Sequence, residues 1–435
     1  MIDTEAVPSG SGKETGMDFS QLQIDQDLLE RINPVFNTAK MTLFQLVYTG
    51  DENARNIADK LGLTKEETQG EVSELELLCN ALVLESRYRT MGAMAEKTGL
   101  AEVDLPCGYT PRAIEFSRKG LSFVGLDLPG AISEAGPAIL SLIDEDKRQL
   151  VRFEGVDATN YESLEKALDG IPGELCITTE GLLMYLTDSE AGQLCDNIRR
   201  LLDKRGGCWI MADPETAIQY VLLSQAVYGD SFMEIMLKGK KRAEERSDVP
   251  VASRTLVIDP KSGEEGIRNA MGFLAQHGLK AERMILGENM PALRSLERLS
   301  DQQKDAVAQA FMKVAYWKVT PVEGRSIDTA EAGGENFELK AELKGDKLII
   351  GLSGRLDTLT APGLLAFYEK TAGENTINEV EADCGSLDYI SSAGLRVLLI
   401  MHKACEKGAA LRSVNKTVRE ILGQTGFDSI LRISE

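Results

Sequence analysis

Short apolar runs alternate with stretches of helical pattern between residues 96 and 320, and this alternation constrains the fold more than any other feature. Each run is long enough for a strand, and each intervening stretch is long enough for a helix. Such alternation predicts an α/β, Rossmann-like fold built on a parallel sheet. The expected strands are AEVDL, LSFVGLDL, LVRFEGVD, ELCITTEGLL and GCWIMADP, followed by RMIL near residues 283–287 and AYWKVTP at 315–321.

Changes in pattern divide the 435 residues into five parts, since a chain of this length exceeds a single compact core. Residues 1–17 are expected to be a flexible tail, without the basic start and apolar core of a signal peptide. In residues 18–95, apolar side chains recur at three- and four-residue spacing, which indicates helices. The α/β domain is expected at 96–320, a Gly/Glu/Thr-rich linker at 321–336, and a separate domain at 337–435.

The helical pattern of residues 18–95 has the order of elements of a winged helix. Thr64 and Glu67 have the spacing of a capping box, and VLESRYRT at 83–90 is expected to form a short closing strand. A winged helix can bind DNA, but residues 51–90 contain nine Asp and Glu against five Lys and Arg. We therefore expect dimerisation or a substrate lid, with DNA binding and a structural cap as alternatives.

Composition excludes several classes of protein. The formal charge of −21 makes nucleic acid a poor partner for the chain as a whole. The sequence contains no run of eighteen apolar residues, so no membrane-spanning helix is expected. Seven cysteines without a C-x-x-C pair, together with only His277 and His402, argue against a zinc cluster and fit a reducing cytoplasm. His277 is expected at a helix end on the surface.

Acidic residues follow four successive expected strands of the α/β domain. Asp104 ends the first strand, and Gly108 follows it in DLPCGYTPR, where the backbone can approach a ligand closely. Asp127 ends the second strand and can accept hydrogen bonds from ribose hydroxyls, whereas Asp157 after the third can meet an adenine amine. Glu180 follows the fourth strand. Ligands bind at this edge of doubly wound sheets, so the pattern predicts a site for an adenosine with a positive centre.

The segments DLPCGYTPR, GLDLP and TEGLLMYLT resemble class I S-adenosylmethionine-dependent methyltransferases of the leucine carboxyl methyltransferase type, over about residues 85–320. The resemblance implies S-adenosylmethionine as cofactor and an upstream arginine for its carboxylate, with Arg89 as first candidate and Arg87 as second. Where the family loop is commonly G-x-G, this chain has Pro106-Cys107-Gly108. The expected cofactor-binding residues are Arg89, Asp104, Pro106, Gly108, Asp127, Leu128, Asp157, Ala158, Glu180 and Gly181.

The same resemblance implies methyl transfer to oxygen, with a small molecule or a carboxylate as acceptor. Displacement at the methyl group depends mainly on alignment of the acceptor, and Tyr185 can orient it; a half-buried core tyrosine is the equal alternative. The N-terminal region resembles the dimerisation domain of small-molecule O-methyltransferases, which implies a homodimer. A signalling protein that senses the cofactor without catalysis is the second hypothesis.

Two segments near the end of the chain, LIIGLSGRLDTLTAPGLL and SLDYISSAGLRVLL, resemble the STAS domain of anti-sigma factor antagonists over 337–435. A hairpin is expected with Gly345-Asp346 at its turn. The resemblance implies a kinase or an anti-sigma-like protein as partner and places the phosphorylated serine at Ser392, with Ser391 where an aspartate is common. A serine that only caps the following helix remains the alternative.

Overall fold

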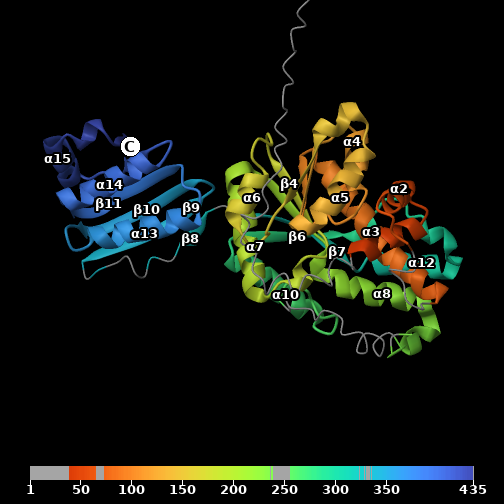
Figure 1. The fold of residues 1–435 in the computed structure, drawn as a ribbon. Helices are drawn as coiled ribbons and strands as arrows, with labels where there is room; N and C mark the ends of the chain where they lie inside the picture. Colours follow the sequence, from red (N-terminus) through yellow and green to blue (C-terminus); the bar gives the residue numbers. More distant parts are fainter. Residues whose placement is uncertain are drawn as a thin grey trace, which may run out of the picture.

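The computed structural model describes residues 39–64, 73–235, 237–238, 255–322, 324–327, 329, 334 and 336–434, and two β-sheets organise them (Figure 1). The tail expected at 1–17 and the capping box that involves Glu67 lie outside these residues. None of the helices within these ranges is both long and apolar enough to cross a bilayer.

The first sheet has seven strands in the order β3-β2-β1-β4-β5-β7-β6, and all seven predicted strands are confirmed. The order reverses between β1 and β4, which is the switch point of a doubly wound sheet. The expectation of a parallel sheet needs one correction, because β7 lies antiparallel between β5 and β6. The strands are β1 (Ala101–Asp104), β2 (Phe123–Asp127), β3 (Val151–Gly155), β4 (Leu175–Thr179), β5 (Gly207–Met211), β6 (Leu279–Ile285) and β7 (Ala315–Pro321).

Helices cover both faces of this sheet, and alternate strand residues enter two separate apolar clusters. Phe123 of β2 packs in the cluster under α4, α5, α8 and α12, whereas its neighbour Val124 packs in the cluster under α6, α7 and α10. The helices are α4 (Arg112–Arg118), α5 (Pro129–Ser141), α6 (Tyr161–Ala167), α7 (Asp188–Arg205), α8 (Thr216–Tyr228), α10 (Gly263–Gln276), α11 (Leu286–Asn289) and α12 (Asp301–Phe311), with short 3₁₀ turns η3 (Glu145–Leu150), η4 (Leu183–Tyr185), η5 (Asp213–Glu215), η6 (Gly229–Ser231) and η7 (Ser295–Arg298).

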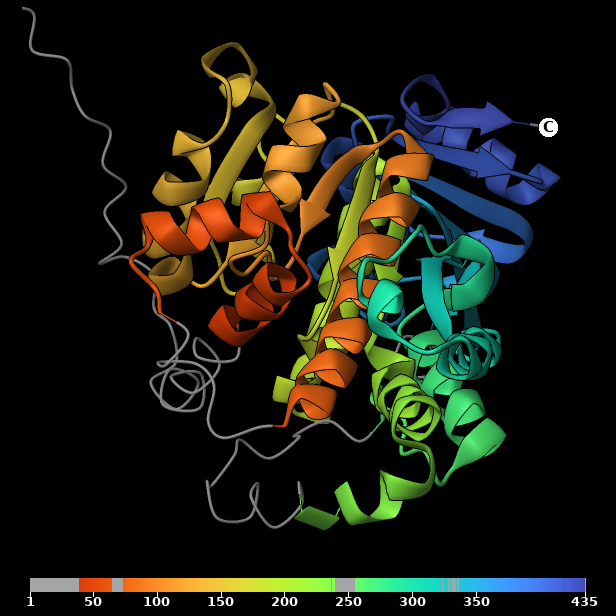
Figure 2. The same cartoon turned by 90° about the vertical axis from the view of Figure 1, so that its right-hand side faces the viewer.

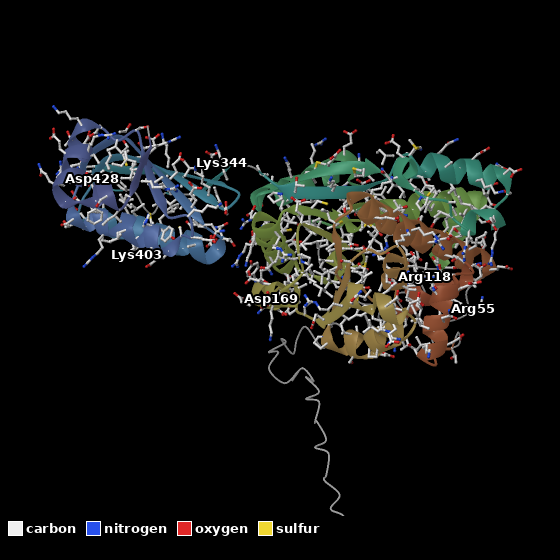
Figure 3. All side chains as sticks on the ribbon, turned by 90° about the horizontal axis from the view of Figure 1, so that it is seen from above. Arg55, Arg118, Asp169, Lys344, Lys403 and Asp428 are labelled. Atoms are coloured by element: carbon white, nitrogen blue, oxygen red, sulfur yellow. The ribbon has the colours of Figure 1, made fainter. Side chains whose placement is uncertain are left out.

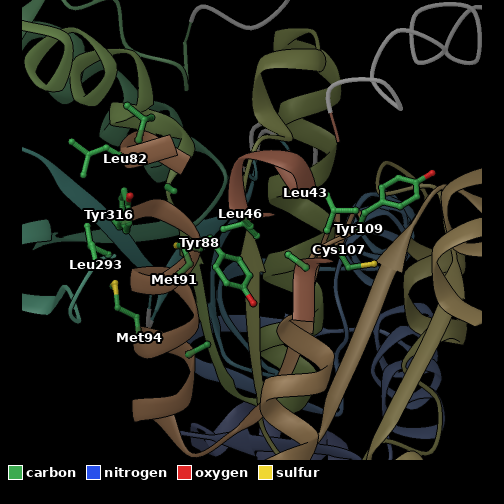
Figure 4. Packing of buried hydrophobic residues seen from close by; sticks show 14 of the residues in the cluster. Leu43, Leu46, Leu82, Tyr88, Met91, Met94, Cys107, Tyr109, Leu293 and Tyr316 are labelled. Carbon is green, nitrogen blue, oxygen red and sulfur yellow. The ribbon is translucent and has the colours of Figure 1, made fainter. Parts of the chain in front are cut away.

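The N-terminal region packs directly on the sheet through a helix at 39–48, α2 (Glu52–Lys60) and α3 (Glu74–Thr98). The strand predicted at 83–90 is wrong, because these residues lie inside α3, which a Ser73–Glu76 capping box starts. In Figure 2, α3 is the long orange helix that runs alongside the first sheet. Figure 4 shows its Leu82, Tyr88, Met91 and Met94 in one cluster with Leu43 and Leu46 of the first helix. The described part of this region therefore contains no wing strand.

The second sheet has the order β13-β12-β11-β10-β9-β8, and its helices cover the apolar face. The predicted hairpin is confirmed, with Lys344 opposite Lys347 and Gly345 at a φ of +58° in the turn. Figure 3 shows charged side chains such as Lys344, Lys403 and Asp428 at the surface of this unit. The elements are β8 (Arg325–Ile327), β9 (Phe337–Lys344), β10 (Lys347–Leu356), α13 (Ala361–Glu374), β11 (Glu379–Ile390), α14 (Ser392–Ala404), β12 (Ala409–Arg412), α15 (Lys416–Thr425), η8 (Phe427–Ser429) and β13 (Arg432–Ser434).

Candidate functional site

A cavity of about 520 Å³ lies at the carboxyl ends of β1, β2 and β4, at the switch point of the first sheet. This is where ligands bind in doubly wound folds, and the volume is typical of small-molecule sites. The loop after β1, the end of β2, the loop after β4, α3, α8 and the helix at 39–48 all contribute to its wall.

The glycine loop after β1 is fastened to the end of β2. Gly108, at a φ of +53°, donates its N–H to Asp127 Oδ2 at 2.8 Å, and Leu128 donates to Asp127 Oδ1 at 2.7 Å. Because a carboxylate has about four lone-pair sites, both oxygens keep acceptor capacity. Burial raises the pKa of Asp127 to about 6, despite these hydrogen bonds, which lower it. Asp127 therefore fixes two loops of the wall and can still accept hydrogen bonds.

A buried ionic network connects β1, β4, α3 and α4 behind this loop. Arg112 lies 2.9 Å from Asp104 Oδ2 and 3.0 Å from Glu180 Oε2, and Arg87 lies 2.9 Å from Glu180 Oε1. Burial alone raises the pKa of Glu180, but the charges of Arg87 and Arg112 outweigh it and hold the pKa below its usual value. Burial raises the pKa of Asp104 to about 6, and it also raises the pKa of Glu102, beside Arg112, well above its ordinary value. Glu180 is thus a poor base with a fixed position.

The loop after β4 is held by one carboxylate from the end of β5. Asp213 is fully buried and accepts the N–H groups of Gly181 at 2.6 Å, Leu182 at 3.0 Å and Leu183 at 3.0 Å. Successive N–H groups that converge on an anion form a stable concave turn. This turn continues into η4, which carries Tyr185 into the cavity wall.

Two helices complete the wall on the side of the N-terminal region. Asn80, Val83, Leu84 and Arg87 of α3 line the cavity, and their spacing places them on one face of the helix. The helix at 39–48 lies against the glycine loop, since a Cβ on Gly108 would stand 3.8 Å from the Cβ of Ala39.

The helix at 39–48 is also fastened to α5. Lys40 pairs with Glu134 at 2.8 Å, and the hydroxyl of Tyr109 donates to the same carboxylate at 2.6 Å. In Figure 4, Tyr109 and Cys107 of the loop after β1 lie near Leu43 of this helix.

The structure brings most of the predicted cofactor-binding residues into one wall, although the binding itself stays a prediction. Arg89 lies outside the wall, where it pairs with Glu85 at 2.8 Å and Asp51 at 3.1 Å. Asp157 and Ala158 are also outside, and Asp157 Oδ1 accepts from the N–H of Thr159 at 2.9 Å. The predicted residues in the wall are Arg87, Asp104, Pro106, Gly108, Asp127, Leu128, Glu180, Gly181 and Tyr185.

Sequence reasoning missed Arg112 and Asp213, and it expected the N-terminal region at the site only as a substrate lid, without naming its wall residues other than Arg87. Asp213 lies two residues after β5 as Asp157 lies two residues after β3, so the strand-end rule would have found it if extended to the fifth strand. Arg112 lies four residues before Phe116 on the buried face of α4, and a charge on an apolar helix face was its signal.

Histidines and metal-binding clusters do not contribute to the described part of the cavity. His277 ends α10 and pairs with Asp196 of α7 at 3.1 Å, and His402 accepts the N–H of Ala409 at 2.9 Å. No group of three or more His, Cys, Asp or Glu suited to a metal occurs among the described residues.

The two serines of the second unit have different positions. Ser391 is the N-cap of α14, and its hydroxyl accepts the N–H of Gly394 at 3.4 Å. Ser392 is the first residue of the helix and is exposed. The cap is therefore Ser391, which leaves the hydroxyl of Ser392 available to a partner.

Comparisons with known proteins find two kinds of similar structure. An anti-sigma factor antagonist from Mycobacterium paratuberculosis is 18% identical over 23% of this chain and 88% of its own, with a TM-score of 0.22. The magnesium protoporphyrin IX methyltransferase of Synechocystis is 12% identical over 65% of this chain and 99% of its own, with a TM-score of 0.34. Human N-acetylserotonin methyltransferase is 14% identical over 64% of this chain and 69% of its own, with a TM-score of 0.31.

These likenesses to methyltransferases are distant, and the finer assignment to the leucine carboxyl type stays a prediction. The C-terminal assignment is firmer, because residues 338–435 match the family model of the STAS domain. The chain therefore joins an α/β region, distantly similar to S-adenosylmethionine-dependent methyltransferases, to a C-terminal STAS domain.

Proposed function

We propose that the α/β region binds S-adenosylmethionine in the switch-point cavity and transfers its methyl group to an oxygen of a small molecule or carboxylate. The observation that carries this proposal is the position of Asp127. Its carboxylate ends β2 in the cavity wall, is held by Gly108 and Leu128, and keeps lone pairs for further donors.

The donor set of the wall suits this cofactor. Asp127 would accept the ribose hydroxyls, and the backbone of Gly108 allows close approach of the methionine part. Arg87 replaces Arg89 as our candidate for the cofactor carboxylate, since it lies in the wall and Glu180 and Thr216 fix its guanidinium. When bound, S-adenosylmethionine would supply an electrophilic methyl group.

The rest of the wall is mainly apolar and suits a small acceptor. Met41, Leu84, Met184, Tyr220 and Val257 line it beside Tyr185. The two carboxylates of Asp104 and Glu180 are committed to arginines, and both histidines of the chain lie elsewhere. These residues can align an acceptor and exclude water, but they offer no free strong base. An acceptor that is already ionised, such as a carboxylate, fits this wall because alignment alone is then required.

Calorimetric titration with S-adenosylhomocysteine tests the cofactor proposal. We expect wild type to bind and Asp127→Asn to bind about 10–100-fold more weakly, because hydrogen bonds to a charged group contribute about 1.5–3 kcal/mol. Asp196→Asn is the matched control, since Asp196 pairs with His277 outside the cavity and should leave the affinity unchanged. Absence of binding to wild type would refute the proposal.

A cofactor sensor without catalysis is the second candidate. It is favoured by Pro106, which takes the place of the first glycine of the G-x-G loop in the cavity wall. Binding without any conversion of S-adenosylmethionine to S-adenosylhomocysteine, across a panel of small apolar carboxylic acids, would favour the sensor.

For the STAS domain we propose regulation through a partner protein and phosphorylation of Ser392. The exposed hydroxyl at the start of α14 supports this, because a phosphate there faces the positive end of the helix dipole. Mass spectrometry after incubation with cell lysate and ATP should find phosphate in wild type and in Ser391→Ala but lose it in Ser392→Ala. Phosphate on other residues alone would contradict the assignment.

A further inference from the structure

Helix α7 connects the cavity to the STAS domain. It starts at the cap residue Thr187, directly after η4, whose Met184 and Tyr185 line the cavity. Its 18 residues span about 27 Å at 1.5 Å per residue. Arg199 and Arg200 lie near its other end. In Figure 1, α7 is on the side of the first unit that faces the STAS domain.

Arg199 contacts the end of a STAS helix. Its side chain is only 4% exposed, pairs with Asp203 at 2.7 Å, and its Nη2 donates to the carbonyl of Glu374 at 3.4 Å. Glu374 is the last residue of α13, where carbonyls lack partners within the helix and a cation is favoured by the helix dipole. The contact therefore gives the carbonyl of Glu374 a donor and gives the guanidinium of Arg199 an acceptor.

A second contact lies beside the first. The guanidinium of Arg200 stacks 3.5 Å over the ring of Tyr161, whose hydroxyl bonds to Glu165 at 3.0 Å and also to Thr376 of the STAS domain. Arg199 and Asp203 line one small pocket together with Gly278 and Val322 of the α/β region and Leu343 and Gly345 of the STAS hairpin. Arg199 thus contacts the STAS domain of the same chain directly, and Arg200 is linked to it through Tyr161.

The opposite end of α13 reaches the serine turn. Helix α13 starts after the turn at 357–360, and the preceding Leu356 accepts the N–H of Ser391 at 2.9 Å. Helices α13 and α14 also pack against each other. One STAS helix therefore connects the Ser391–Ser392 turn to Arg199.

We propose that the Arg199–Arg200 face of α7 is the docking surface of the STAS domain, and that it couples occupancy of the cavity to the state of the Ser391–Ser392 turn. The proposal rests on the proposed function for the identity of the cavity ligand. A ligand that orders η4 and the start of α7 would also order the far end of α7 and its contact with Glu374. Linkage then requires that a partner at the serine turn changes cofactor affinity by the same factor.

Hydrogen exchange of the full chain with and without S-adenosylhomocysteine tests this coupling. In wild type, the ligand should slow exchange both in residues 180–187 at the cavity and in residues 371–378 at the domain contact. Arg199→Ala should lose the slowing at 371–378 and keep it at 180–187, which also shows that the variant is folded. Gln193→Ala is the control, because Gln193 is exposed on the same helix away from the domain contact; it should behave as wild type.

The outcomes separate the two proposals. No slowing at 180–187 in wild type would remove the proposed function. Slowing at 180–187 without any change at 371–378 would overturn the coupling alone. Slowing at 371–378 that persists in Arg199→Ala would overturn the role of the α7 contact.

Discussion

The two sheets of this chain place their charges in opposite ways. The first buries a network of Arg87, Arg112, Asp104 and Glu180 beside its cavity. In the described part of the STAS domain, the buried polar residues are only Thr371 and Asn375, and charged side chains stay at the surface. Buried charges are costly unless paired, and a paired network beside a cavity fits the ligand site that we propose there. A domain without them is suited to act through its surface.

The largest expected effect of this difference is on stability. Arg112→Ala removes a partner of both Asp104 and Glu180, and we expect it to lower the free energy of unfolding by about 3–5 kcal/mol. Arg412→Ala, which breaks pairs with Glu381 and Asp383 on the open face of the STAS sheet, should cost at most about 1 kcal/mol.

The two tryptophans make this comparison measurable. Trp209 and Trp317 are buried in β5 and β7, so their fluorescence in urea reports the first sheet, and circular dichroism reports both. Similar losses of unfolding free energy in Arg112→Ala and Arg412→Ala would contradict the expected difference between the two sheets.

The STAS domain should be more sensitive to packing than to charge. A Cβ on Gly394 would stand 2.8 Å from the carbonyl oxygen of Leu356, so Gly394→Ala should destabilise this domain by about 1–3 kcal/mol. A Cβ on Gly373 of α13 would meet no atom within 4 Å, so Gly373→Ala should stabilise the STAS domain by up to about 1 kcal/mol. Denaturation followed by circular dichroism should show that the two substitutions change the free energy of unfolding in opposite directions. Changes in the same direction would refute the prediction.

Cofactor binding should depend on pH through Asp127. Its pKa of about 6 means that the carboxylate is ionised above pH 6 and becomes protonated below it, when it loses acceptor capacity. Affinity for S-adenosylhomocysteine should therefore be constant near pH 7.5 and about tenfold lower at pH 5. Asp127→Asn should remove this dependence. An unchanged profile in that variant would assign the titration to another group, such as Asp104.

The smallest expected difference is between the two neighbouring serines. Ser391→Ala removes the cap of α14 and should cost about 1 kcal/mol of STAS stability. Ser392→Ala, at an exposed first helical position, should change it by less than about 0.5 kcal/mol. Equal costs in denaturant would mean that both hydroxyls are structural.

The sequence predicted the sheets better than it predicted the N-terminal helices. Strands of the first sheet are marked by apolar runs with turn residues at their ends, and this local signal sufficed. In VLESRYRT, the β-branched and aromatic residues favoured a strand, but the Ser73 cap and the good helix formers along α3 outweigh them.

The same helix separates the two candidate arginines, which a strand would keep together. In a strand, Arg87 and Arg89 share a face, whereas in a helix residues two apart are separated by about 200°. Arg87 consequently enters the cavity wall and Arg89 faces Asp51 and Glu85. Asp157 lies outside for a different reason, since β3 is an edge strand and β2 separates it from β1 at the switch point. Strand order is a tertiary property that local patterns do not specify.

The four cavity residues of α3 repeat at intervals of three, one and three along a single helix face. Three of them, Asn80, Val83 and Leu84, are free of the ionic network that fixes Arg87. Substitutions at these three positions change the shape of the cavity without moving a strand or breaking an ion pair. Under the proposed function, the range of acceptors can therefore change through one stripe of one helix, while the sheet and the STAS contact stay unchanged.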